Sequence, residues 1–467
     1  MSEELVSKSA NDLAYLIKSR AVSIIEVVES HLARIDQQNS ALNAITTINP
    51  NLIDQARTRD KEMVSGHVAG PLHGVPLTIK DTIATAGLRS TSGSRLRAEY
   101  LPDADAPVVE RLKRAGAIIL GKTNTSEMAI PYETDNPVFG RTNNPHNLNR
   151  TSGGSSGGEA AAIAARLSPA GVGSDLSGSI RVPAHFCGVA GLKPTTGRVP
   201  AGGHQPDVAG PLSLGAAIGP IARRVTDLLL LFNVMADEPS IETSEKEFAD
   251  RAVQELAGLN VAYYAGDGVA PVTYEIARAV ASAATALHEA GLQTHEERPP
   301  AVSEGSRLWI ELFSRAAADQ LSEFYQGHED TAGPSAASIL RRRTKVTSME
   351  TRIEAAENLA RAVVERERLR EGLLRWMKST PLVIAPVGAT AAFEHGAERL
   401  QVGGQSISTF RAFSYSQTFN VFGLPAVSVP VARTDEGLPV GVQIIGRPLE
   451  EVRVLQAAAI IERAFSG

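Results

Sequence analysis

The chain has 467 residues, of which 43% are hydrophobic and 21% are charged. This length is enough for one large or two ordinary domains, and this composition is typical of a soluble globular protein. The formal net charge is −6 and no long basic run occurs, which argues against nucleic acid as a main partner.

The location of the protein is predicted from its first residues, its apolar runs and its cysteine content. The sequence begins Met1-Ser-Glu-Glu-Leu, which lacks the basic and apolar regions of a signal peptide. The apolar run at 228–232 is far too short to span a bilayer, so we expect no membrane-spanning segment. Cys187 is the only cysteine, which excludes intrachain disulfides. We therefore expect a cytoplasmic protein.

Helices and short strands alternate through the first 130 residues. Helices are predicted within 9–36 (two of them), at roughly 51–65, at 108–115 and near 126–129, and a buried strand at 117–120. Within the first region, Ser23 and Glu26 fit a capping box. A strand is predicted at 75–79, where apolar residues alternate with others, and Lys80 ends it. A lysine at a strand end is usually a solvated charge, and it becomes a candidate functional residue only if the fold brings it to the serine loops described next.

Two serine-containing glycine loops lie close together in the sequence, after a loop predicted at 131–152. The first is Gly153–Gly158 and the second is Ser177-Gly178-Ser179. Ser156 and Glu159 fit a capping box, which predicts a helix through 160–167. A short strand at 170–173 should then deliver Asp175 and Ser179 at its C-terminal end.

Glycine allows the backbone to approach another atom closely and to adopt a positive φ. The two loops therefore indicate a site where backbone N–H groups face a reacting oxygen. The first loop has two alternative interpretations, a simple helix entry and an anion nest for phosphate. Neither a P-loop pair nor a G-x-G-x-x-G fingerprint after a strand occurs in the chain.

The second half of the chain predicts further α/β structure. A long glycine-rich loop at 194–220 precedes an apolar helix, which Thr226-Asp227 should cap and which should run through Met235. Strands are predicted at 260–264, 292–294, 382–385, 426–431 and 440–445, and helices at 273–290, over most of 303–378 with a break near 330–334, and at 452–465. Within 359–376 the apolar residues fall on one helix side.

The alternation of strands and helices predicts an α/β fold with crossover connections. Neither a repeat nor a linker rich in Ser or Pro divides the chain, so we expect one domain over 1–467. Residues 70–235 should form its core with the serine loops. Residues 300–380 should form a helical region near the pocket, and strands within 381–467 should complete the sheet.

Eight stretches of the sequence, taken together, are similar to the amidase signature family. They are GVPLTIKD (74–81), GKTNTSEMA (121–129), NPVFGRTNNP (136–145), GGSSGGE (153–159), GSDLSGSIRVPAHFCGVAGLKPTTGRVP (173–200), GPIARRVTDL (219–228) and the pair GLPAVSVPV (423–431) and GLPVGVQIIG (437–446). The resemblance implies a single α/β/α domain with a mixed sheet between helices. It also implies hydrolysis of a carboxamide C–N bond without metal or cofactor, and by analogy a homodimer.

The resemblance implies a Ser–cis-Ser–Lys triad. Carried over by motif, Ser179 is the nucleophile, Ser155 is the bridging serine with a cis peptide bond before it, and Lys80 is the base. A serine hydroxyl is a weak nucleophile until a base takes its proton, and lysine can be that base only when neutral. The pKa of about 10.4 must therefore fall by roughly 3 units, a shift that burial can supply.

The reaction implied by the triad passes through an acyl-enzyme. Backbone N–H groups among Leu176, Ser177, Gly178 and Ser179 should hold the oxyanion. The relay then protonates the departing amine, and water enters along the same relay to release the acid. Where the family commonly has glycine, this chain has Ser177, which must hold a backbone conformation that L-residues allow.

Other residues receive lesser roles. Ser156, Asp175 and Arg181 should orient the nucleophile loop by hydrogen bonds, a structural role more than a chemical one. By position, the segment Met128-Ala129-Ile130 resembles residues that line the acyl pocket in relatives, and an ordinary helix core is the alternative.

The cysteine and the histidines suggest other chemistry only weakly. Cys187 with His185 is interpreted as a buried structural cysteine and not as a nucleophile pair. His73, His146 and His204 lie in loops and match no zinc spacing, so no metal site is predicted.

Three functions remain open at this point. The first is a free-standing amidase acting on a small or mid-sized carboxamide, and the second is the glutaminase subunit of a tRNA-dependent amidotransferase. The segment 200–220 departs from the pattern of such subunits, which favours the first. The third is a binding protein, against which the intact triad argues.

Three aromatic residues either make the pocket apolar, favouring aryl or alkyl acyl groups, or belong to the core: Trp309, Phe313 and Tyr325.

Overall fold

A large mixed sheet forms the centre of the computed structural model, which describes residues 2–130, 132–239, 243–343 and 349–465. Its strands are β1 (Ile45–Ile48), β2 (Pro76–Lys80), β3 (Ile118–Thr123), β6 (Ala170–Asp175), β7 (Ala190–Lys193), β8 (Ala217–Ala222), β9 (Asn260–Tyr263), β10 (Gln293–Glu296), β11 (Leu382–Pro386), β14 (Ala426–Arg433) and β15 (Pro439–Ile445). The 11 strands are ordered β1-β3-β2-β6-β8-β7-β14-β15-β11-β9-β10. Strand β2 runs parallel to both β3 and β6, whereas β8 runs antiparallel to β6 and β7.

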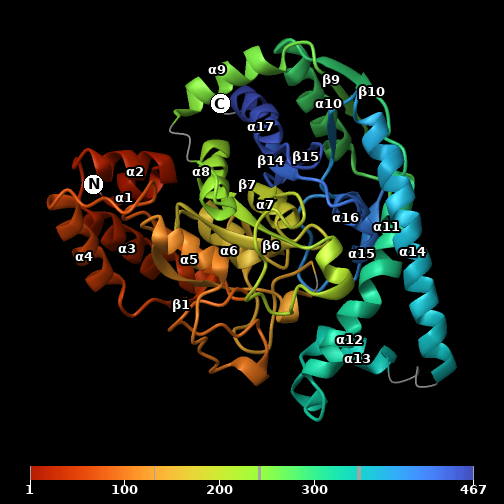
Figure 1. Cartoon of the computed structure of the whole chain (residues 1–467), viewed down its shortest axis with the longest axis horizontal. Coiled ribbons are helices and arrows are strands. Elements are labelled where there is room, and N and C mark those ends of the chain that lie inside the picture. The colour runs from red at the N-terminus through yellow and green to blue at the C-terminus, as the bar shows by residue number, and fades with distance from the viewer. Residues whose placement is uncertain (1, 131, 240–242, 344–348, 466–467) are drawn as a thin grey trace.

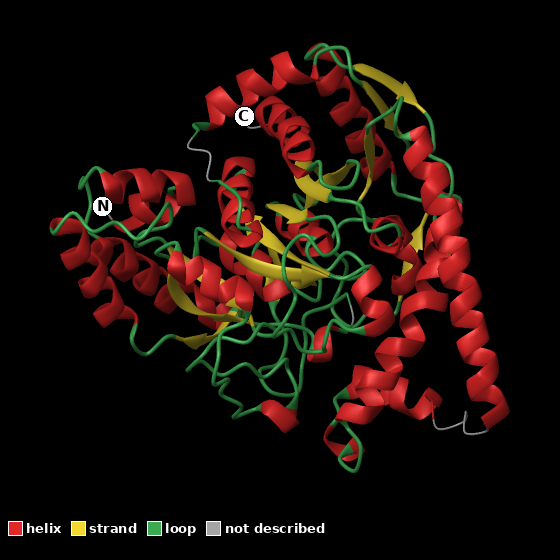
Figure 2. Cartoon of the chain, viewed as in Figure 1, coloured by secondary structure: helices red, strands yellow, loops and turns green. Residues whose placement is uncertain are grey.

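Helices cover both faces of this sheet, and the alternation of side chains along its strands explains why. In β3, Ile119 packs into one core with α5 (Pro107–Arg114) and α8 (Val225–Ala236). Its neighbours Ile118 and Leu120 pack into a second core with α3 (Ile24–Leu42) and α6 (Gly157–Ala164). Successive strand residues point to opposite faces, so each face needs its own apolar cover. Figure 2 shows the strands crossing the middle of the molecule with helices on both sides. The predicted α/β fold is confirmed.

The remaining helices extend this covering. The N-terminal group is α1 (Ser2–Ser7), α2 (Ala10–Lys18), α3 and α4 (Leu52–Val64), and the others near the sheet are α7 (Arg181–Cys187), α9 (Glu245–Leu256), α10 (Tyr274–Glu289), α16 (Ser414–Val421) and α17 (Glu451–Phe465). The N-terminal group lies together at one side of the molecule, beside β1 (Figure 1). The predicted capping box begins α3, where the Glu26 N–H donates to Ser23 Oγ. Among the described residues, no helix is both long and apolar enough to cross a membrane.

The region predicted as mostly helical forms an arm on the side opposite the N-terminal group (Figure 1). It contains α11 (Gly305–Trp309), α12 (Arg315–Phe324), α13 (Pro334–Arg343) and α14 (Met349–Trp376), and the small helix α15 (Thr409–Ala412) follows later in the chain. A short 3₁₀ helix, Glu329–Thr331, lies at the predicted break. On α14, Leu373 is buried and Leu359, Val363 and Leu369 pack partly buried against the main core, as the periodicity predicts.

The capping box predicted at Ser156 is wrong. Ser156 makes no side-chain capping bond, and α6 ends at Ala164, earlier than predicted. The Glu159 carboxylate instead accepts hydrogen bonds from the hydroxyls of Thr78 and Thr123, the latter at 2.7 Å. These threonines lie on β2 and β3, so contacts with distant strands replaced the local cap.

Two segments predicted as loops contain strands. Residues 131–152 include the hairpin β4 (Asn143–Asn144) and β5 (Asn147–Thr151), and residues 194–220 include most of β8. Gly219 and Pro220 favour a loop locally, but pairing with β6 and β7 on both sides makes β8 a central strand. A second hairpin, β12 (Arg399–Val402) with β13 (Gln405–Ser408), was not predicted.

The predicted cap of α8 is also wrong. Arg224 is the N-cap residue, and Thr226-Asp227 lies inside the helix. The Asp227 carboxylate accepts hydrogen bonds from the backbone and side chain of Asn11, on α2. This acid therefore joins two helices and does not begin one.

Candidate active site

The sheet topology brings Lys80 to the second serine loop. Strands β2 and β6 are parallel neighbours, so their C-terminal ends, Lys80 and Asp175, lie at the same edge of the sheet. Ser155 sits just before α6, which packs on both strands. The Lys80 side chain is fully buried, with its Nζ 2.6 Å from Ser155 Oγ and 2.9 Å from Ser174 Oγ. The condition that made Lys80 a candidate functional residue is therefore met.

Burial changes the acid–base behaviour of this lysine. It lowers the pKa of Lys80 to about 7, although the negative charges of Asp175 and Glu159 act in the opposite direction. A buried ammonium loses hydration, which favours the neutral amine. A substantial fraction of Lys80 is thus neutral near pH 7, as a base requires.

The two candidate serines line one cavity, from two adjoining loops. The peptide bond between Gly154 and Ser155 is cis, as the resemblance implies. The Ser156 N–H donates to the Ser179 carbonyl at 3.2 Å, which joins the first loop to the second. Ser156 Oγ also contacts Ser174, accepting from its N–H at 3.4 Å, so this residue ties the loops together as expected. Within the described residues, no hydrogen bond joins the hydroxyls of Ser155 and Ser179. Such catalytic contacts often tighten only when substrate binds.

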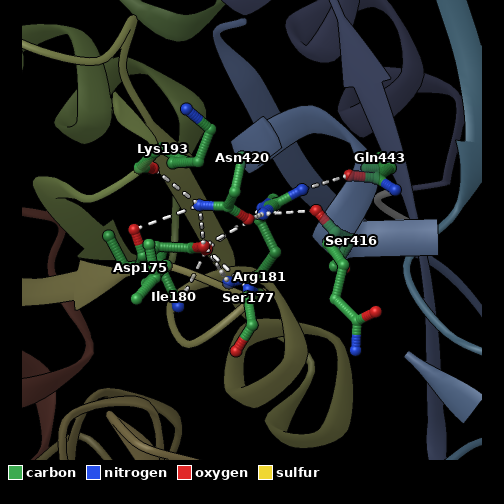
Figure 3. Close-up of polar contacts among 12 residues, drawn as sticks. Asp175, Ser177, Ile180, Arg181, Lys193, Ser416, Asn420 and Gln443 are labelled. Atoms are coloured by element: carbon green, nitrogen blue, oxygen red, sulfur yellow. Dashed lines mark hydrogen bonds and ion pairs between the residues drawn. The ribbon is translucent and has the colours of Figure 1, made fainter. Parts of the chain in front are cut away.

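Asp175 holds the loop that carries Ser179. Its carboxylate accepts hydrogen bonds from the N–H groups of Gly178 at 2.8 Å and Ile180 at 3.1 Å, on either side of Ser179. It also accepts from Nε and Nη2 of Arg181 at 3.0 and 2.9 Å, and from Asn420 Nδ2 at 3.0 Å (Figure 3). Burial alone would raise the pKa of Asp175, but the Arg181 guanidinium lowers it well below its usual range. Asp175 and Arg181 are therefore bonded to the loop that carries Ser179, and their role in orienting the nucleophile stays a prediction.

Asp175→Asn is expected to lower the free energy of unfolding by about 3–5 kcal/mol, because it leaves a fully buried guanidinium without its counter-charge. Urea unfolding of the full chain measures the loss. Asp54→Asn is the matched control, since the Asp54–Arg57 pair is exposed and should contribute less than about 1 kcal/mol. A loss below about 1 kcal/mol for Asp175→Asn would contradict the role of this ion pair.

The expected oxyanion donors do not behave alike. The Gly178 N–H is occupied by Asp175, so the structure does not leave it free for an oxyanion. In the described part of the chain, the N–H groups of Leu176, Ser177 and Ser179 have no protein acceptor. The carbonyls of the first two accept hydrogen bonds from Trp309 Nε1 at 2.8 Å and from the Tyr132 hydroxyl at 3.1 Å.

The serine in place of the usual glycine is tolerated for a simple reason. Within the loop 176–179, the positive φ falls on Gly178, at 111°. Ser177 therefore keeps a backbone conformation that L-residues adopt readily.

The cavity beside Ser179 has a volume of about 590 Å³. The segment Met128-Ala129-Ile130 lines it, as the resemblance implies, together with Leu176, Trp309 and Phe410. Phe313 and Tyr325, the other two aromatic residues considered, are fully buried and do not line it. The pocket interpretation thus holds for Trp309, and the core interpretation holds for the other two.

The remaining candidates lie away from this chemistry. Cys187 is buried, burial raises the pKa of its thiol, and its Sγ contacts the Ser152 carbonyl. His185 contacts the Thr390 carbonyl and accepts from the Gly441 N–H at 2.7 Å. Over the described ranges, no three His, Cys, Asp or Glu side chains are grouped as metal ligands would be.

Two residues of the site were missed by sequence reasoning. Ser174 contacts Lys80 directly, and His204 Nε2 is 2.8 Å from Ser174 Oγ; both residues line the cavity. Ser174 stands next to Asp175 in the glycine-serine block, which could have indicated it. His204 comes from the segment predicted as a long loop, and no local pattern indicates its place.

Comparison with known proteins shows which family the chain belongs to. Residues 26–455 match the family model described as Amidase. The A-type subunit of the glutamyl-tRNA(Gln) amidotransferase from Synechococcus sp. (strain CC9605) is 33% identical, over 96% of this chain and 94% of that protein. Acylamidase of Rhodococcus erythropolis is 33% identical, over 97% and 94%. The solved structure of 6-aminohexanoate cyclic dimer hydrolase with its substrate has a TM-score of 0.83 at 30% identity, covering 99% of this chain and 98% of that one. With these likenesses spanning the whole fold and site, the chain belongs to the amidase signature family.

Proposed function

We propose that this amidohydrolase cleaves the C–N bond of a small to mid-sized linear carboxamide with an apolar acyl group, through an acyl-enzyme on Ser179. The observation that carries the proposal is the buried Lys80 amine, 2.6 Å from Ser155 Oγ and beside the cavity that Ser179 lines. A neutral lysine in that position can take a proton through one serine from the next.

The reaction proceeds in two steps. Ser179 Oγ attacks the amide carbonyl carbon while its proton passes through Ser155 to Lys80. The free N–H groups of Leu176, Ser177 and Ser179 hold the oxyanion. The relay returns the proton to the departing nitrogen, the C–N bond breaks and the acyl ester remains on Ser179. Water then attacks the ester by the same proton path and releases the carboxylic acid.

The cavity supports an apolar acyl group. Its volume lies within the range of small-molecule sites, and its walls near the serine loops are mainly apolar side chains. Trp309 is fixed by its hydrogen bond to the Leu176 carbonyl, so this wall is rigid. Such walls favour alkyl or arylalkyl acyl groups over charged ones.

Ammonia release from a panel of primary amides tests the proposal. The panel holds aliphatic amides, arylacetamides, benzamide, amino-acid amides and glutamine. The wild-type enzyme should release ammonia from arylacetamides and mid-length aliphatic amides faster than from glutamine. Release of neither ammonia from these amides nor amine from their N-substituted analogues would contradict the proposal.

A second candidate is the glutaminase subunit of a tRNA-dependent amidotransferase. It is favoured by the 33% identity to the Synechococcus protein, over nearly all of both chains. Release from glutamine alone, or only after a partner protein is added, would favour this candidate. The homodimer stays a prediction, which light scattering of the purified chain tests.

The kcat/KM for the best amide is expected to rise with pH through about 7 and then level off. The reason is the pKa of Lys80, which burial lowers to about 7, since only the neutral amine above that pH can accept a proton. Initial rates between pH 5 and 9 measure the profile. A rate that is flat across this range, or that falls above pH 7, would contradict Lys80 as the base.

A further inference from the structure

A line of buried polar groups runs from Lys80 along the wall of the cavity that the two triad serines also line. Lys80 Nζ is 2.9 Å from Ser174 Oγ, which is 2.8 Å from His204 Nε2. The other ring nitrogen, His204 Nδ1, is 2.7 Å from the Pro206 carbonyl oxygen. Lys80, Ser174 and His204 are all buried. Some groups along this line can only accept a hydrogen bond, and these groups determine where the protons lie.

The Pro206 carbonyl fixes the tautomer of His204. A carbonyl oxygen can only accept, so Nδ1 must carry a proton. Burial is the main reason that the pKa of His204 is lowered to about 4, and the nearby charge of Lys80 adds to this. The ring is therefore neutral at pH 7, and its Nε2 can only accept. The single hydroxyl proton of Ser174 must then point to Nε2.

The direction of the Ser174 O–H bond decides which group the lone pair of the Lys80 amine can face. Because its proton is committed to His204, Ser174 offers Lys80 only lone pairs. A neutral amine has two N–H groups and one lone pair, and one N–H is drawn toward Ser174. The lone pair is then left for the hydroxyl proton of Ser155. If the Ser174 hydroxyl were free to turn, it could donate to that same lone pair and compete with Ser155.

We propose that His204 is a positioning residue that holds the Ser174 hydroxyl away from Lys80, so that the lone pair of the lysine amine faces Ser155. This inference rests on the proposed function. His204 also lines the cavity, but among the described residues its hydrogen-bond link to Lys80 runs through Ser174. The charged groups acting on Lys80 are Asp175 and Glu159, and the hydrogen bonds that the described residues make with His204 involve neither of them.

Two substitutions separate this role from simple packing. His204→Phe keeps the ring volume and still excludes water from the site, but it removes the hydrogen-bond acceptor Nε2. His204→Gln places an amide oxygen near the position of Nε2 and restores the acceptor. His288→Phe is the matched control, because His288 is exposed on α10, remote in sequence from the serine loops.

His204→Phe is expected to lower kcat for the best amide about tenfold or more, with KM little changed. The acid limb of the pH profile should also move to lower pH, because the freed Ser174 hydroxyl stabilises the neutral amine. His204→Gln should stay within a few-fold of wild type in rate and keep the limb near its wild-type position. A packing role alone would lower the rate without moving the limb. An unmoved limb in His204→Phe, or a His204→Gln variant as slow as His204→Phe, would overturn the proposal.

A second measurement needs no substrate. The ¹⁵N chemical shifts of histidine side chains in the full chain report protonation and tautomer, and the His204→Gln variant assigns the His204 signal. We expect a neutral ring with the proton on Nδ1 at pH 7. A protonated ring, or the Nε2–H tautomer, would overturn the proposal. An inactive wild-type enzyme would instead count against the proposed function, and the shifts would still test His204.

Discussion

Ser179→Ala is expected to lower kcat/KM for the best amide by about 10⁴-fold or more, because removing a nucleophile ends the acyl-enzyme route. The free energy of unfolding should change by less than about 1 kcal/mol. Within the described residues, the Ser179 hydroxyl makes no hydrogen bond, so its loss leaves no polar partner unsatisfied. Ammonia release and urea unfolding measure the two quantities.

Intact mass spectrometry adds a direct readout of the same step. With a slowly hydrolysed amide, wild type should gain the mass of one acyl group during turnover, and Ser179→Ala should gain none. Ser213→Ala is the control, since Ser213 is exposed and, among the described residues, its hydroxyl donates only to the nearby Gly210 carbonyl. If Ser179→Ala kept a tenth or more of the wild-type rate, the nucleophile would have to be another residue.

Lys80→Met should lower kcat about 10³-fold or more, because the side chain keeps much of its volume but loses the base, and a relay acts as a unit. The acid limb near pH 7 should disappear from the residual activity. Stability should not fall, since folding lowers the pKa of Lys80 and therefore works against its charge at neutral pH. Steady-state rates across pH and urea unfolding measure these effects.

A second buried lysine provides the matched control. Lys122 is fully buried on the neighbouring strand β3, and its amine contacts Thr85 Oγ1 at 3.0 Å and Ser90 Oγ at 3.2 Å. It does not line the cavity. Folding lowers the pKa of Lys122 too, to about 8, so Lys122→Met should likewise leave stability little changed, and it should leave kcat nearly unchanged. Equal losses of kcat in both variants would mean that burying an amine, and not its position, matters for the rate.

The elements that could be predicted from the sequence carry strong local patterns. The alternation at 75–79 predicts β2 even though both faces of that strand are buried, and Ser23 with Glu26 predicts the start of α3. Where local and distant contacts compete, prediction failed. Glu159 fits a capping box but contacts β2 and β3, and the Gly219-Pro220 pair indicates a loop but lies in a central strand.

The candidate site, like the fold, could be predicted from the sequence only in part. The resemblance places Lys80, Ser155 and Ser179 by motif, and the structure brings them to one cavity. Two contacts depend on how two loops fold over the end of β6: Gly178 donates to Asp175, and His204 reaches Lys80 through Ser174. No spacing in the sequence encodes these contacts, because they join segments whose approach is set by the whole sheet.

The hydrogen bonds of Arg181 bear on when the nucleophile loop can order during synthesis of the chain. This side chain bonds to Gln443 on β15 and to Asn420 on α16, both from the last fifty residues of the chain. In synthesis these two residues follow Lys80, Ser155 and Ser179, and distant contacts form only once both partners exist. A nascent chain of 400 residues already contains those three side chains, yet it lacks two of the groups that hold Arg181 in place.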